Sequence, residues 1–131
     1  MQANGLFKEW IARAQNDIEA AKILADHYKP KIEIICYLCQ QTVEKMLKAF
    51  LVFNHVEPGR IHDLEVLCAE CEKNDNTFAV LREKCGVLTK YNTQTRYPNN
   101  KMDFFEHHMH QAIKYADEIY NFVLEKINNN K

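Results

Sequence analysis

Apolar residues recur at alternating intervals of three and four positions over most of this chain. In the first such segment they are Phe7, Trp10, Ile11, Ala14, Ile18, Ala21, Leu24 and Ala25. This spacing places the apolar side chains on one face of an α-helix, which is then buried against other helices. Asp17 falls on the same face. It is a polar residue at a position where the pattern predicts an apolar one.

The same periodicity continues in four further segments. Their apolar stripes begin at Ile32, Leu64, Phe78 and Phe105, and the last one ends at Ile127. Only three glycines and three prolines are present, too few for many short strands joined by tight turns. A chain of 131 residues is long enough to build one hydrophobic core. We therefore predict an all-α, antiparallel (up-and-down) bundle of four to five helices, forming a single domain over residues 1–131 with a core of about 6–127.

Composition restricts the class of protein and its partners. The formal net charge is -1, so no overall basic field attracts nucleic acid and any anion site must be local. No apolar run approaches the ~20 residues of a membrane span. The N-terminal segment MQANGLFKEWIARAQ has charges and no continuous apolar stretch, unlike a signal peptide. Five cysteines without a secretion signal are typical of free thiols in a reducing compartment. We expect a cytoplasmic protein that has no membrane contact.

The cysteines form two Cys-x-x-Cys pairs, Cys36 with Cys39 and Cys68 with Cys71. Four thiolates can bind zinc, but tight turns normally present each pair of ligands. Here both pairs lie within helical stripes, and cysteine packs well as a small buried hydrophobe. We therefore predict that these thiols fill the core, and we expect neither a metal nor a cofactor.

Histidines occur in two places with different interpretations. His107 and His110 are one helical turn apart, but they lack the acidic partner of a His-Glu-x-x-His site. A solvated helix face with His108 half-buried explains them better. His62 and Asp63 begin the third predicted helix. For this pair, helix capping and a functional role both stay open.

A polar row interrupts the apolar pattern of the second helix. Gln41, Glu44, Lys45 and Lys48 are spaced so that they form one strip along it. A solvated strip with a Glu44–Lys48 pair, worth only ~0.3–0.5 kcal/mol, is the plainer interpretation. The alternative is that the strip binds a ligand.

The segment TRYPNN, at residues 95–100, precedes the last helix and contains Arg96, Tyr97 and Pro98. Proline here can simply end a helix. An arginine fork can also grip a phosphate through two hydrogen bonds, and a tyrosine ring can stack on a base. The segment alone does not distinguish the two interpretations.

These motifs occur in an order that resembles the HEPN family. A Trp-x-x-x-Ala opening is followed by Asp17, QQTVEKMLKAFLV, HDLEVL and TRYP, and the resemblance extends from about Phe7 to Val123. It implies a nucleotide-binding bundle that usually dimerises. Prokaryotic relatives often pair with a minimal nucleotidyltransferase in modules like toxin–antitoxin systems. The positions that match the family's recurring residues are Asp17, Gln41, Glu44, Lys45, Lys48, His62, Asp63, Arg96, Tyr97 and Pro98.

One departure from the family concerns catalysis. Many HEPN proteins are metal-independent ribonucleases that carry an arginine followed by a histidine after four to six intervening residues. Arg13, Arg60, Arg82 and Arg96 all lack a histidine at that distance. RNA cleavage needs a base for the 2′-hydroxyl and a cation for the phosphorane. The arginine–histidine signature that would supply these two groups is absent from this chain.

Three functions follow as hypotheses, and we prefer the first, a nucleotide-binding module. Lys45, Lys48 and Arg96 would bind phosphate, Tyr97 or Tyr91 would stack on the base, and Asp17, Glu44 and Gln41 would orient the cations or bind the ligand. The cleft would lie between the second helix and residues 95–100, within one chain or across a homodimer. The second hypothesis is a diverged ribonuclease with His62 as base and Arg96 as clamp. The third is a protein-interaction module that binds a nucleotidyltransferase.

Overall fold

The computed structural model describes residues 2–92 and 103–130 of the chain. It contains the α-helices α1 (Gln2–Ala25), α2 (Ile32–Phe53), α3 (Leu64–Glu72), α4 (Arg82–Thr89) and α5 (Glu106–Asn129), and the short 3-10 helix η1 (Asn76–Leu81). No strand occurs within these residues. The predicted all-α bundle is confirmed. The fourth predicted helix differs in one respect, since its first part is the 3-10 helix η1.

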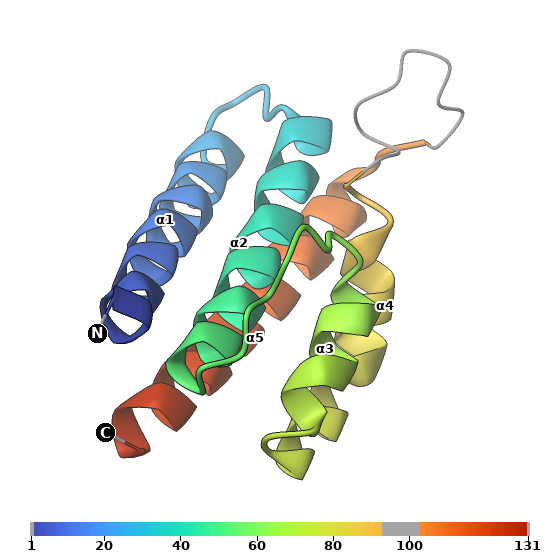
Figure 1. Cartoon of the computed structure of the whole chain (residues 1–131). Coiled ribbons are helices and arrows are strands. Elements are labelled where there is room, and N and C mark those ends of the chain that lie inside the picture. Colours follow the sequence, from blue (N-terminus) through green and yellow to red (C-terminus); the bar gives the residue numbers. More distant parts are fainter. Residues whose placement is uncertain (1, 93–102, 131) are drawn as a thin grey trace.

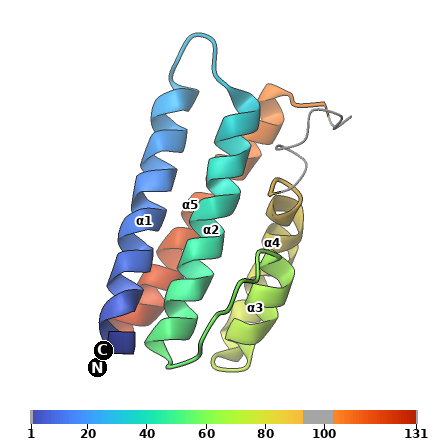
Figure 2. The ribbon, with the colours of Figure 1, turned by 45° about the horizontal axis from the view of Figure 1, so that its top comes forward.

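Helix α2 is the centre of the bundle and contacts each of the other four α-helices. Helices α1 and α2 form a long antiparallel hairpin, with α5 beside them, and α3 and α4 form a shorter hairpin on the other side of α2 (Figures 1 and 2). Residues 54–63, which we call the return strap, run back along α2 before α3 begins (Figure 1). Helices α2 and α3 therefore run in the same direction. The sequence did not predict this return.

The chemistry of α2 follows from its central position. Its apolar stripe is buried from Ile35 onward, and four of its polar or charged residues are buried as well: Gln40, Thr42, Glu44 and Lys48. Helices pack around α2 on several sides, so it keeps little surface for solvent. The interpretation of the polar row as a solvated strip is therefore wrong for Glu44 and Lys48.

Two local motifs shape the return strap. Helix α2 ends in a Schellman motif, in which the amides of Val56 and His55 donate to the carbonyls of Leu51 (2.8 Å) and Val52 (3.0 Å). His55 takes the left-handed conformation at the position where glycine is usual (φ 63°). At the far end of the strap, Asp63 is the N-cap of α3.

The thiols and the histidines of α5 have the predicted surroundings. All five cysteines are free and buried, which confirms that they pack in the core. Burial raises the pKa of the Cys36 thiol to about 12. His107 and His110 are exposed and His108 is half-buried. Across residues 2–92 and 103–130, no three acidic, cysteine or histidine side chains gather as a metal site, and no helix has the length and apolarity to cross a bilayer.

Candidate functional site

A buried carboxylate, that of Glu44, connects α2 to the return strap. Its Oε2 accepts a hydrogen bond from Lys48 Nζ (3.1 Å) and also bonds to His62 Nδ1 (2.9 Å). Its Oε1 accepts from Gln40 Nε2 (3.1 Å). The side chains of Glu44 and Lys48 are only 6% and 5% exposed. The pair predicted from the i, i+4 spacing is therefore present, but it lies inside the protein.

The contacts continue from α2 to α1. Gln40 Oε1 accepts from Gln41 Nε2 (2.7 Å), and Gln41 Oε1 accepts from Lys45 Nζ (3.2 Å). Lys45 Nζ in turn donates to Asp17 Oδ2 at 2.6 Å. A continuous set of hydrogen bonds thus joins Asp17 on α1 to His62 on the strap. We call these seven residues the polar network: Asp17, Gln40, Gln41, Glu44, Lys45, Lys48 and His62.

Burying two opposite charges next to each other seldom adds stability. Removing each ion from water costs several kcal/mol, and the attraction between them roughly offsets that loss only when the geometry is good. Glu44 has three hydrogen-bonding partners, and the Lys48 ammonium also lies 5.5 Å from the centroid of the Trp10 ring. An apolar pair of similar volume could fill this space, so stability alone does not account for the buried charges.

His62 presents a defined nitrogen to solvent. A carboxylate can only accept a hydrogen bond, so this contact favours the tautomer in which Nδ1 donates and Nε2 carries the lone pair. The side chain is 58% exposed although its partner Glu44 is buried. The ring is thus held from inside while its other nitrogen is free to meet a ligand. This arrangement suits a hydrogen-bond acceptor or a general base.

The chain resembles known proteins in both sequence and fold. The profile of the HEPN domain family matches residues 7–127. The chain belongs to the HEPN domain family. Two solved structures have the same fold over 92% of this chain and 97% of their own. They are TT1696 from Thermus thermophilus (TM-score 0.82, 23% identity) and ST0689, an archaeal HEPN homologue (TM-score 0.74, 28% identity). No match was found among curated proteins.

Six of the residues predicted for the site of this HEPN domain come together in the polar network: Asp17, Gln41, Glu44, Lys45, Lys48 and His62. Asp63 lies apart from them, because its carboxylate accepts from the amides of Glu65 (2.8 Å) and Val66 (3.3 Å) and so caps α3. Arg96, Tyr97 and Pro98 lie outside the described residues.

The prediction for Tyr91 needs correction. Its ring is fully buried, in contact with Phe104 and the Cys36 thiol, so it cannot stack on a base from solvent. Burial also raises the pKa of its hydroxyl. Tyr91 follows Leu88 by three positions and so continues the apolar stripe that begins at Phe78. That periodicity was the better guide to its role.

Sequence reasoning also missed two parts of the site. Gln40 is fully buried and donates to both Glu44 Oε1 (3.1 Å) and the His62 carbonyl (3.2 Å), which makes it the link between the halves of the network. Its place four residues before Glu44 was the available signal. The second missed part is Trp10, which was assigned to the core stripe. It is only half-buried and lines a cleft of about 590 Å³ beside the return strap.

Proposed function

We propose that this HEPN domain binds a nucleotide through the polar network and works beside a minimal nucleotidyltransferase. The observation that carries the proposal is that six predicted site residues, from two helices and the strap, are joined through Gln40 into one set of hydrogen bonds. Family membership supports the same conclusion. A network of this kind holds its charged groups in place before a ligand arrives, which lowers the entropy lost on binding.

The members of the network have different roles in this proposal. Lys45 and Asp17 are partly exposed, at 19% and 21%, so a phosphate oxygen can share the Lys45 ammonium with the carboxylate. His62 offers its outer nitrogen to the ligand. Glu44 and Lys48 lie behind them and hold His62 in position.

Isothermal titration with a panel of nucleotides, nucleosides and inorganic phosphate tests the proposal. We expect heat with at least one nucleotide and a weakening of about tenfold or more in Lys45→Gln, since a charged hydrogen bond is worth roughly 1.5–3 kcal/mol. Lys22→Gln is the matched control, because Lys22 forms a similar pair with Asp117 (2.9 Å) outside the network. No heat with any nucleotide, from folded wild-type protein, would refute the proposal.

The partnership rests on the family resemblance. We propose that the chain forms a homodimer and binds a short nucleotidyltransferase encoded beside it, as in a toxin–antitoxin-like pair. Sedimentation of the purified chain tests the dimer, and co-purification with the neighbouring gene product tests the pair. A monomer at micromolar concentration, or separate elution of the two proteins, counts against the respective part.

The Glu44–His62 contact favours a second candidate function, ribonuclease activity. A histidine oriented by a buried carboxylate can take the proton of a 2′-hydroxyl, and Arg96 would be the cation that the reaction needs. Incubation with tRNA in the presence of chelator should then give products with 2′,3′-cyclic phosphate ends. His62→Ala and Arg96→Ala should each abolish them. Cleavage that survives both substitutions comes from a contaminant.

A further inference from the structure

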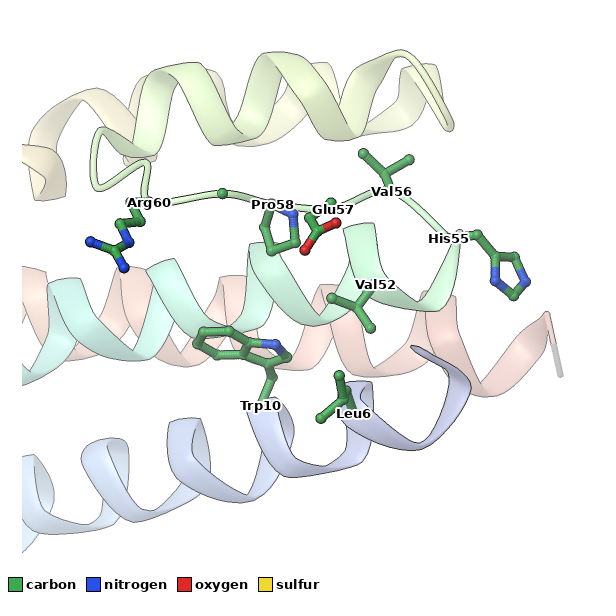
Figure 3. Close-up of a pocket in the computed structure, with 9 residues that line it drawn as sticks. Leu6, Trp10, Val52, His55, Val56, Glu57, Pro58 and Arg60 are labelled. Atoms are coloured by element: carbon green, nitrogen blue, oxygen red, sulfur yellow. The ribbon is translucent and has the colours of Figure 1, made fainter. Parts of the chain in front are cut away.

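The cleft beside the return strap has the size of a small-molecule site. Its volume of about 590 Å³ lies within the roughly 300–1,000 Å³ of ligand pockets. Leu6 and Trp10 of α1 form one side, Val52 of α2 lies between, and the strap forms the other side (Figure 3). Its lining residues on the strap are His55, Val56, Glu57, Pro58, Gly59 and Arg60.

The apolar part of this cleft suits a flat ring. The Trp10 indole is partly exposed and projects from α1 into the space facing Pro58 (Figure 3). Stacking of a nucleobase on an aromatic side chain is worth about 1–3 kcal/mol and tolerates any base, because every base has a π-face. Hydrogen bonds from the strap to the end of α2, such as Val56 N to Leu51 O (2.8 Å), hold the opposite wall in place.

One end of the cleft carries an available cation. Arg60 is exposed and projects from the strap toward α2, at the end where the Trp10 ring lies (Figure 3). Within the described part of the chain, its guanidinium forms no ion pair or hydrogen bond, in contrast to Lys45 and Lys48. A planar guanidinium binds a phosphate through two parallel hydrogen bonds.

The cleft adjoins the polar network. Lys48, whose ammonium contacts Glu44 at 3.1 Å, is also the residue next to the Trp10 ring. His62, bonded to the same carboxylate, follows Arg60 by two positions on the strap. A ligand with a flat ring at one end and a negative charge at the other would thus meet Trp10 and Arg60, which both line the cleft.

We propose that this cleft binds a nucleoside monophosphate, with the base stacked on Trp10 and the phosphate on Arg60. The proposal rests on the proposed function and deepens it: the base is placed in the cleft, and Arg60 joins Lys45 as a second cation for the ligand's phosphate. It also makes Arg60 a binding residue, a role that the family motifs did not assign.

Trp10 is the only tryptophan in the chain, so intrinsic fluorescence reports directly on the cleft. We expect nucleoside monophosphates to quench it in a saturable way and inorganic phosphate to leave it unchanged. Arg60→Gln should weaken nucleotide binding about tenfold or more while quenching by the uncharged nucleoside persists. Lys8→Gln is the matched control, since it removes one positive charge from α1 at an exposed position outside the cleft lining.

Calorimetry on Trp10→Leu, with circular dichroism to confirm folding, completes the test. Binding weakened about tenfold in this folded variant supports stacking. If wild type binds a nucleotide by calorimetry without quenching, and Arg60→Gln and Trp10→Leu bind equally well, the cleft proposal is overturned and the proposed function stands. If no nucleotide binds at all, both fail. A fluorescence change caused only by a nucleotidyltransferase partner would make the cleft a protein contact and would also overturn the proposal.

Discussion

At the scale of single residues, the candidate site is built around the charged pair of Glu44 and Lys48. Both side chains are almost fully buried and hydrogen-bonded to each other at 3.1 Å. Glu44 also hydrogen-bonds to the exposed His62 at 2.9 Å, so the same carboxylate contacts one partner inside the bundle and another at the surface. If the pair served packing alone, an apolar pair of similar volume would serve as well.

Removing one member of this pair should destabilise the fold more than removing both. We expect Lys48→Met to lower the free energy of unfolding by about 3 kcal/mol, because the Glu44 carboxylate stays buried without its cation. The double variant Glu44→Leu/Lys48→Met should lose less than Lys48→Met alone. Urea unfolding measures both. Lys22→Met, from an exposed pair, should change stability by less than about 1 kcal/mol, and purely additive losses at 44 and 48 would contradict this account.

The sequence predicted which residues of the polar row on α2 are neighbours, but it did not predict that Glu44 and Lys48 are buried. The i, i+4 spacing of Glu44 and Lys48 is a property of the helix alone, so their pairing could be predicted. How many helices surround α2 depends on tertiary packing, which a single stripe does not encode. For Tyr91 the aromatic side chain suggested stacking on a ligand, whereas its place in the apolar stripe correctly indicated burial.

At the scale of elements, the junction of the return strap with α3 positions the site. Asp63 ends the strap and caps α3, next to His62. A charged cap directly before an apolar run is a local signal, so this helix start could be predicted. The path of the strap along α2 could not be predicted, because Pro58 and Gly59 indicate a turn but not the direction in which the chain continues after α2.

Removing the Asp63 cap should therefore destabilise α3. We expect Asp63→Ala to lower the free energy of unfolding by about 1 kcal/mol, since the amides of Glu65 and Val66 lose their acceptor. Asp63→Asn keeps an acceptor oxygen and should be nearly neutral. Hydrogen exchange should speed up at those two amides in Asp63→Ala and not in Asp63→Asn. Equal exchange in the two variants would show that the carboxylate does not cap the helix.

At the scale of the whole molecule, the core thiols link stability to pH. Burial is the main cause of the raised pKa of Cys36, Cys39 and Cys71, whereas the pKa of Cys85 is raised first by its hydrogen bond with Cys68 and then by burial. For Cys36 the value rises from 9.0 to about 12. A raised pKa in the folded state favours the neutral thiol. Its stabilising contribution is therefore complete below pH 9.0 and is lost as the pH rises toward 12.

Alkaline conditions should consequently unfold this bundle. Each thiol that is protonated in the folded chain and ionised in the unfolded chain lowers the free energy of unfolding by up to about 1.4 kcal/mol per pH unit above its unfolded pKa. The urea midpoint should therefore change little from about pH 7 to about pH 8 and fall between about pH 9 and about pH 10. Cys36→Ala should be less stable near neutral pH, because it opens a cavity, but its midpoint should fall less steeply. If the wild-type and Cys36→Ala midpoints fall in parallel, Cys36 does not control the alkaline transition.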